Sequence, residues 1–168
     1  METAVIGEMT QYLTFRLADE IYALDISKVR EVLDVGSVTK VPRTPDFMRG
    51  VINLRGSVVP VADLRLRFGM SMTEKTVNTC VIITEISVNG EAVVLGVLAD
   101  SVQEVIELYQ NNITPPPRIG TQVRADFISG MASKDDRFLM ILDIDKVFSS
   151  DGIALVRHGE TQPGSERN

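Results

Sequence analysis

Short apolar runs separated by turn-forming residues recur along the chain, a pattern typical of strands joined by tight turns. In the stretch 47–69, the runs Val51–Leu54 and Val58–Val61 flank Arg55-Gly56-Ser57, which predicts a β-hairpin. Because proline has no N–H to donate to a neighbouring strand, Pro60 predicts that its strand lies at a sheet edge or beside a bulge. We therefore expect part of a sheet edge to be open at this hairpin.

Short helices are predicted between the strands. They are expected near Ser27–Leu33, Ala62–Phe68 and Ser101–Glu107, with a last one near Asp145–Phe148. In the first helix, Val29 and Val32 fall on one face at helical spacing, and Ser27 can cap its start. Asp63 and Asp100 can cap the next two helices by accepting hydrogen bonds from first-turn N–H groups.

The two halves of the chain resemble each other. Further strands are predicted at Tyr12–Leu17, Ile21–Leu24, Val38–Val41, Cys80–Ile86 and Ala92–Leu98, and in a pair around Lys134-Asp135-Asp136. The segment Val29–Leu33 matches Val102–Ile106, 73 positions later. Phe47, Gly50, Asp63 and Phe68 match Phe127, Gly130, Asp143 and Phe148, 80 positions later. The same order of elements is predicted in both halves: helix, proline link, Phe-x-x-Gly, hairpin and capped helix. This repetition indicates a duplicated unit of about five strands.

Five short strands per half predict two small barrels, because such strands cannot bury both faces of a flat sheet. Each barrel is barely large enough to be stable alone, so the two lobes are expected to share apolar surface. The predicted domain covers residues 11–149, with lobes at about 11–70 and 79–149. Residues 1–10 have no clear period, and residues 151–168 end in small, polar turn formers, so both tails are expected to be mobile.

Composition and charge exclude several classes of function. The chain has 168 residues, 44% of them hydrophobic, as expected for a globular protein. Its net charge of −6 works against binding of a phosphate backbone, so no nucleic-acid partner is expected. No apolar run approaches the ~18 residues of a membrane span. The acidic start of the chain is unlike a secretory signal, which predicts a cytoplasmic protein that does not insert into membranes.

The chain lacks the usual combinations of catalytic residues. His158 is the single histidine, so neither a Ser-His-Asp triad nor a histidine-rich metal site can be assembled. Cys80 is the single cysteine, which excludes an internal disulfide and favours a small buried hydrophobe. The carboxylates of Asp135-Asp136 and of Asp143 and Asp145 are interpreted as turn and helix-start residues. We therefore predict a protein that is not an enzyme and uses no metal or cofactor.

One stretch resembles a known family. The sequence FMRGVINLRG followed by VVPVADLR closely resembles the core motif of CheW, an adaptor family of bacterial chemotaxis, and the likeness extends over about Gln11–Ser149. The resemblance implies two intertwined five-stranded SH3-like barrels. It also implies an adaptor with two partners, the regulatory domain of the histidine kinase CheA and the cytoplasmic tip of a methyl-accepting chemoreceptor. Such an adaptor would be recruited to membrane-associated receptor arrays.

The resemblance also implies two binding surfaces. A receptor-binding groove between the lobes would include Ile26, Val29, Glu31, Val32, Gly50, Arg55, Cys80, Gly96 and Val102. A kinase-binding edge would include Val38, Lys40, Val41 and Val58. From the residues alone, Val29 and Val32 are ordinary core positions, and Arg55 and Glu31 are ordinary solvated charges. The family pattern instead places an arginine and a glutamate at Arg55 and Glu31 as a functional pair.

Two alternatives stay open at this point. One is a CheW-like coupling module of another chemosensory-type pathway, such as pilus motility. The other is a small-ligand-binding barrel or enzyme, which would require a deep pocket with convergent polar groups. Barrels of SH3 size rarely contain such a pocket, because side chains fill them.

Overall fold

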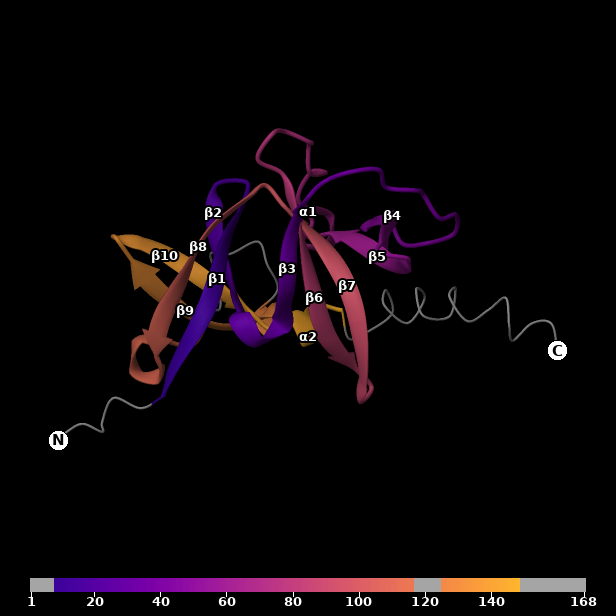
Figure 1. The fold of residues 1–168 in the computed structure, drawn as a ribbon. Helices are drawn as coiled ribbons and strands as arrows, with labels where there is room; N and C mark the ends of the chain where they lie inside the picture. The colour runs from indigo at the N-terminus through magenta and orange to yellow at the C-terminus, as the bar shows by residue number, and fades with distance from the viewer. Residues whose placement is uncertain (1–7, 117–124, 149–168) are drawn as a thin grey trace.

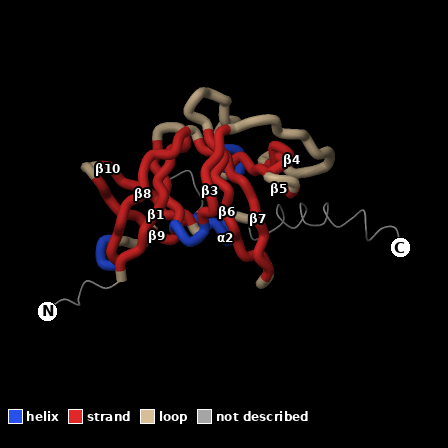
Figure 2. The backbone as a smooth tube through the Cα atoms, in the orientation of Figure 1, coloured by secondary structure: helices blue, strands red, loops and turns tan. Residues whose placement is uncertain are grey.

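The computed structural model describes residues 8–116 and 125–148, and strands make up most of this part (Figures 1 and 2). The strands are β1 (Met9–Leu17), β2 (Glu20–Asp25), β3 (Val29–Asp34), β4 (Met48–Leu54), β5 (Ser57–Asp63), β6 (Cys80–Val88), β7 (Glu91–Ala99), β8 (Ser101–Tyr109), β9 (Ile128–Lys134) and β10 (Arg137–Leu142). The α-helices are α1 (Leu64–Arg67) and α2 (Ile144–Val147), and the short 3-10 helices are η2 (Ile26–Lys28), η3 (Gln110–Asn112) and η4 (Ala125–Phe127). None of the helices described is long and apolar enough to cross a membrane. Most of the two predicted tails lies outside the described residues, but Met9 and Thr10 belong to β1.

The strands form two five-stranded sheets. Sheet A has the order β8-β1-β2-β10-β9, and sheet B has the order β3-β6-β7-β5-β4. Neighbouring strands are antiparallel except for β2 with β10 and β5 with β7, which are parallel. Figure 1 shows sheet A on the left and sheet B on the right. The predicted mostly β fold with two five-stranded lobes is confirmed.

Each sheet combines strands from both halves of the chain. The hairpin β1–β2 shares sheet A with β8, β9 and β10, whereas the hairpin β6–β7 shares sheet B with β3, β4 and β5. The chain therefore crosses from sheet A to sheet B at η2 and returns at Asp100, between β7 and β8. The predicted lobe boundaries at about 11–70 and 79–149 are wrong, because the two halves exchange their hairpins.

The backbone pairing repeats between the halves, as a duplication requires. Equivalent pairs are Val29 with Thr84 and Val102 with Phe15, each beside a bulge, and Val61 with Gly96 and Ile141 with Ala23 in the parallel ladders. Asp63 N donates to Phe47 O at 2.7 Å, and Asp143 N donates to Phe127 O at 2.8 Å. Since hydrogen-bond register recurs together with sequence, the predicted duplication is confirmed.

Two of the predicted helices are strands. Most of Ser27–Leu33 belongs to β3, and Ser101–Glu107 belongs to β8. A bulge between Val29 and Glu31 explains the error. In a regular strand, side chains three positions apart point to opposite faces. The extra residue of the bulge reverses this alternation, so Val29 and Val32 share a face as they would in a helix. The same bulge occurs at the equivalent place in the pairing of β8.

The other helix and hairpin predictions agree better with the structure. Of Ala62–Phe68, only the second part is helical, as α1, because Ala62 and Asp63 end β5. The last predicted helix is α2. The hairpin predicted around Arg55-Gly56-Ser57 forms, and the strand pairs β1–β2, β6–β7 and β9–β10 are hairpins as well. In the β6–β7 turn, Asn89 and Gly90 have φ of 53° and 83°, the positive values that a type I′ turn requires.

The region around Pro60 agrees with the predicted bulge and not with a sheet edge, because β4 has a bulge between Met48 and Gly50, beside the Val51–Pro60 pair. Strand β5 lies between β7 and β4, so it is not an edge strand. Pairing with β7 begins only at Val61, which leaves Pro60 with a neighbouring strand on one side alone. The predicted strand Val38–Val41 is reduced to one bridge, in which Thr39 N and O bond to Val51 O and N at 2.9 and 2.8 Å.

Buried apolar side chains form three clusters. Each curved sheet encloses one of them, and we call the sheet with its cluster a lobe. The cluster of lobe A includes Ile21, Ala23, Leu139 and Ile141, and that of lobe B includes Val59, Val61, Val81 and Ile83. The largest lies between the sheets and includes Phe15, Tyr22, Ile82, Val97 and Phe148; we call it the shared core. Successive side chains of a strand alternate between a lobe cluster and the shared core, so both faces are buried. The expected sharing of apolar surface is thus confirmed.

A buried carboxylate fixes the connection after α1. The Asp63 side chain is fully buried, and its Oδ2 accepts from Arg49 Nη1 and Thr73 N, both at 3.0 Å. Its Oδ1 accepts from Thr73 Oγ1 at 2.8 Å and from Arg65 N at 3.0 Å. These bonds attach the connector that follows α1 to the end of β5. The equivalent residue in the other half, Asp143, is half-buried and caps α2 by accepting from Lys146 N.

We predict that Asp63→Asn lowers the free energy of unfolding by about 3 kcal/mol. The side-chain NH2 group of asparagine would face the N–H and O–H donors that now bond to Asp63, and Arg49 would lose its carboxylate partner. Urea unfolding followed by circular dichroism measures this loss. Asp143→Asn is the matched control, and it should cost less than about 1 kcal/mol because asparagine is a good N-cap. Equal losses at the two positions would contradict the role given to the Asp63 network.

Candidate functional site

Most of the apolar residues predicted for the receptor groove lie on the face of their sheet that turns toward the other sheet. Ile26, Val29 and Val102 are half-buried and pack against the margin of the shared core. Val32 pairs with Ile82 of the shared core and is 38% exposed. Paired residues project to the same face, so this face of β3 continues the shared core to the surface.

Cys80 lies beside these residues at the start of β6. It is half-buried, and its Sγ donates to Asn78 O at 3.3 Å. Burial raises the pKa of the Cys80 thiol; the backbone of Val102 lowers this pKa in part, and the charge of Asp34 raises it again. Cys80 is therefore a protonated thiol at neutral pH, in contact with the first residues of β8.

One exposed residue of this set was missed by the sequence analysis. Val105 is 49% exposed and pairs with Leu13 of the shared core. The match of Val29–Leu33 with Val102–Ile106 contained the signal, since Val105 is the equivalent of Val32. Below, Ile26, Val29, Val32, Cys80, Val102 and Val105 are called the seam residues.

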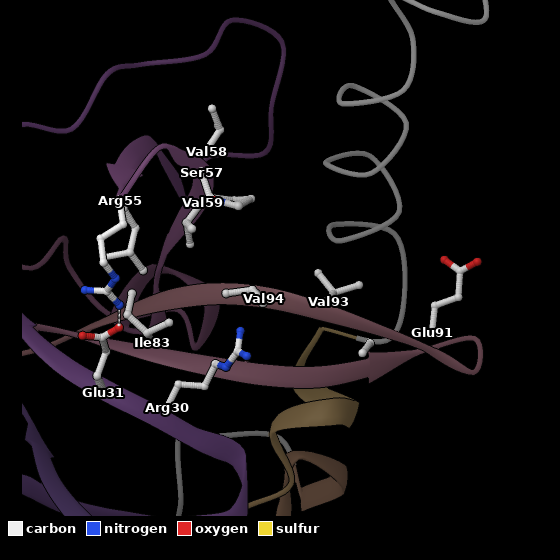
Figure 3. A pocket seen from close by; sticks show the side chains of 13 residues that line it. Arg30, Glu31, Arg55, Ser57, Val58, Val59, Ile83, Glu91, Val93 and Val94 are labelled. Atoms are coloured by element: carbon white, nitrogen blue, oxygen red, sulfur yellow. Dashed lines mark hydrogen bonds and ion pairs between the residues drawn. The ribbon is translucent and has the colours of Figure 1, made fainter.

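Arg55 and Glu31 form an ion pair, as expected from the motif (Figure 3). Glu31 lies on the edge strand β3, and Arg55 lies in the turn that follows the opposite edge strand, β4. The pair thus ties the two open edges of sheet B together across the mouth of its lobe. Glu31 pairs with Ile83, which faces the interior of lobe B, so Glu31 and Val32 lie on opposite faces of β3.

The Arg55–Glu31 pair is largely in water. The side chain of Arg55 is 70% exposed and that of Glu31 is 31% exposed. A guanidinium that follows an apolar strand is expected to be partly desolvated, but that of Arg55 is not, because a two-residue turn projects it away from the sheet. An exposed pair of this kind contributes about 0.2–1 kcal/mol to stability, so it serves mainly to orient the turn.

An open cavity of about 770 Å³ lies next to this pair. Its apolar wall includes Val59, Ile83 and Val94, and Arg30 and Arg55 lie at its border (Figure 3). The charges of Glu31 and Arg55 are directed at each other rather than into the cavity. The cavity is lined by polar as well as apolar side chains, but Arg30, Glu31 and Arg55 are held in ion pairs with other side chains, so it adds no support to a ligand-binding barrel.

The two glycines predicted for the receptor groove do not lie on an accessible surface. Gly50 is buried with φ of 143°, and an added Cβ would lie 2.1 Å from Thr39 O. Gly96 is also buried, and its Cβ would lie 2.7 Å from a methyl group of Val81. Both positions need glycine because neighbouring chain segments approach closely. Neither glycine therefore presents much surface of its own to a partner.

Three of the four residues predicted for kinase binding lie at two separate cavities, and the fourth, Val38, lines neither of them. Lys40 and Val41 are exposed and line a cavity of about 410 Å³ beside the proline-rich link. Val58 is 66% exposed and lies at the cavity next to Arg55. Val38 is half-buried and packs closely on Gly50, since a Cβ added to Gly50 would lie 3.0 Å from a Val38 methyl group. The start of β5 and the link before β4 therefore offer separate contacts rather than one continuous pocket.

Within residues 8–116 and 125–148, no group of three or more His, Cys, Asp or Glu side chains is placed to hold a metal ion. His158 lies outside the described residues. The features that stand out are apolar side chains at the surface, on the seam and near the edge of sheet B. The fold and these surfaces define a two-lobed β protein suited to binding other proteins.

Comparison with known proteins identifies the family. The CheW-like domain matches residues 11–152. The chemotaxis protein CheW of Klebsiella aerogenes is 37% identical over 146 residues, covering 87% of this chain and 86% of the relative. CheW of Treponema pallidum is 32% identical over 147 residues, covering 88% and 86%. The chain belongs to the CheW-like domain family.

A solved structure supports the same assignment. The crystal structure of the scaffolding protein TtCheW from Thermoanaerobacter tengcongensis is similar, with a TM-score of 0.76 and 38% sequence identity. The similarity covers 90% of this chain and 96% of TtCheW. At this identity and coverage, the two-lobed arrangement described above is the arrangement of a CheW scaffold.

We predict that Arg55→Asn and Glu31→Gln change the melting temperature by less than about 2 °C, because their pair is exposed. Asparagine suits the positive φ of 50° at Arg55, so the substitution removes the charge without straining the turn. The same variants should reduce kinase activation in the presence of receptor, and the double variant should be no worse than either single one. Additive losses would show that the two side chains do not act as a pair.

Proposed function

We propose that this protein is a non-catalytic adaptor of bacterial chemotaxis that couples chemoreceptors to the CheA histidine kinase. Membership of the CheW-like domain family supports the adaptor role, and the relatives named above are chemotaxis proteins. Its proposed partners are the regulatory domain of the kinase and the cytoplasmic helical tip of a methyl-accepting chemoreceptor. Through the receptor it would be recruited to membrane-associated arrays.

The seam is the proposed receptor-binding surface. Val32 and Val105 extend the shared core to the surface from one sheet each. An amphipathic receptor helix with an apolar stripe can pack on these valines and on Val29 and Val102. This arrangement is the observation that carries the proposal, because a helix bound there would contact both lobes. Its binding would then depend on how the lobes are oriented, and a change in the receptor could bias the kinase.

The proposed kinase-binding surface is the edge of sheet B near β4. Lys40 and Val41 are exposed there, and Val58 is exposed at the neighbouring end of β5. The kinase domain is expected to resemble this protein, and the edge of a homologous barrel can dock against these side chains. The single bridge at Thr39 covers only a short part of the edge strand.

We predict that Val29→Glu and Val102→Glu each weaken binding of a receptor cytoplasmic fragment at least tenfold, because a carboxylate would be desolvated against the shared core. Isothermal titration calorimetry measures this affinity, and circular dichroism shows whether the fold is retained. The matched control is Val77→Glu, since Val77 is 96% exposed in the connector after α1 and should leave affinity unchanged. Retention of wild-type affinity by folded Val29→Glu would refute the seam as the receptor site.

We predict that the double variant Val41→Glu/Val58→Glu weakens binding of the kinase regulatory domain at least tenfold and leaves receptor binding intact. The reason is that two exposed apolar contacts would be replaced by charges at one edge of sheet B. Surface plasmon resonance with the kinase domain and the receptor fragment, injected singly and together, tests both parts. Competition between the two partners for the protein would contradict separate sites.

A second candidate is a coupling role in another chemosensory-type pathway. Protein FrzA of Myxococcus xanthus, which does not carry the CheW name, is 33% identical over 142 residues. The match covers 83% of this chain and 86% of FrzA. Affinity purification from the source cells separates the two candidates, with the kinase identified by mass spectrometry and Val41→Glu/Val58→Glu as the control. A chemotaxis kinase that is lost in the control supports the first function.

A further inference from the structure

One end of the seam is held by an ion pair at α1. Arg65 Nη1 donates to Asp100 Oδ2 at 2.9 Å, and Ala18 N donates to the same oxygen at 2.6 Å. Asp100 is the residue at which the chain returns from sheet B to sheet A, and Ala18 lies in the β1–β2 turn of sheet A. Arg65 belongs to α1, which follows the last strand of the first half. This contact, called the α1 clasp, therefore joins the two lobes.

A second ion pair holds α2 in the same way. Lys28 Nζ donates to Asp145 Oδ2 at 2.8 Å, and Ser87 N donates to Asp145 Oδ1 at 2.9 Å. Lys28 lies in η2, where the chain crosses from sheet A to sheet B, and Ser87 lies near the end of β6 in sheet B. Asp145 belongs to α2, which follows the last strand of sheet A. This contact, called the α2 clasp, again joins the two lobes.

The two clasps occupy corresponding places in the duplication with exchanged charges, although their crossing residues are one position apart, since the 73-position match pairs Lys28 with Ser101. The register that matches Val29 with Thr84 and Val102 with Phe15 also makes Ser87 the equivalent of Ala18, and the match of Asp63 with Asp143 makes Asp145 the equivalent of Arg65. In the α1 clasp the helix carries the base and the crossing carries the acid. In the α2 clasp the helix carries the acid and the crossing carries the base. Each half thus has an ion pair where the chain crosses between the lobes, but different residues form it.

Each clasp lies directly before a seam valine. Lys28 precedes Val29, and Asp100 is two residues before Val102. Figure 1 shows α1 and α2 at opposite ends of the region where the two sheets meet. We propose that the α1 and α2 clasps are positioning contacts that set the relative orientation of the lobes and thereby align the seam valines for the receptor helix. This proposal rests on the proposed receptor-binding role of the seam.

The two clasps differ in exposure, which gives the joint a fixed and a releasable end. The side chains of Arg65 and Asp100 are 18% and 14% exposed, and Arg65 also donates to Ser71 O and Ser71 Oγ at 3.0 and 2.9 Å. The side chains of Lys28 and Asp145 are 34% and 30% exposed. Water and salt weaken the more exposed pair first. The lobes therefore pivot about the α1 clasp when the α2 clasp opens.

The test uses Lys28→Gln and Asp145→Asn at the α2 clasp. Asparagine retains an oxygen for Ser87 N–H, so these variants remove the charge attraction with the least disturbance. Arg30→Gln is the matched control, because Arg30 and Glu85 form an exposed ion pair within sheet B at 3.6 Å. Asp100→Asn probes the α1 clasp and should also lower the melting temperature, since that pair is drier.

The first measurement is the distance between spin labels on the two lobes, which does not depend on any partner. Cysteines replace the exposed Ser133 of sheet A and Asn53 of sheet B, in a Cys80→Ala background used for every sample. The parent and Arg30→Gln should give one narrow distance distribution. Lys28→Gln and Asp145→Asn should broaden it, and high salt should broaden the parent distribution in the same direction. Unchanged distributions in both α2 variants would overturn the proposal.

The second measurement is affinity for the receptor fragment and for the kinase regulatory domain, in the chain with its native cysteine. Lys28→Gln and Asp145→Asn should weaken receptor binding about fivefold and leave kinase binding unchanged, since only the receptor contacts both lobes. Equal receptor affinity in the parent and both variants would overturn the positioning role. If the parent binds no receptor fragment, the proposed function fails, and the spin-label distances alone decide whether the clasps orient the lobes.

Discussion

The exchange of hairpins between the two halves is the constraint on which the rest of the structure depends. Sheet A is complete only when β1 and β2 pair with β8 and β10, and sheet B is complete only when β6 and β7 pair with β3 and β5. The shared core is formed by the faces that these sheets turn toward each other. A single cooperative unit follows, because removing either half would leave open edges and exposed apolar faces in both lobes.

Local features of this fold could be predicted from the sequence, whereas the exchange could not. Hairpins, the Asn-Gly turn and the Asp-capped helices are encoded within a few neighbouring residues. The pairing of β1 with β8 joins Thr14 to Glu104, which are 90 positions apart. In a duplicated chain, β3 and β8 carry the same pattern, so no local signal tells β1 which of the two to choose. The pairing of β1 with β8 is favoured only in the complete fold, where both sheets bury their facing sides in the shared core.

The candidate site shows a similar division. Val29 and Val32 were correctly assigned to one face for a wrong reason, since a bulge rather than a helix gives them that face. The Arg55–Glu31 contact could be predicted because the family motif names both residues. Gly50 and Gly96 show the limit of an inference by resemblance, because the structure explains both glycines by close packing of neighbouring segments. Val105 was missed although a helix and a bulged strand both place it on the face of Val102, because only its match with Val32 in the duplication singles it out.

The separation between pairing partners has a consequence during synthesis. When β1 leaves the ribosome, about 90 further residues must be made before Glu104 can pair with Thr14. At roughly 5–20 residues per second, the first hairpin waits on the order of 5–20 s with an unpaired edge. Arg16, Asp19 and Glu20 place charges on or beside that hairpin, which disfavours pairing with other chains. The nascent chain must therefore keep its first strands soluble until much of its second half has been made.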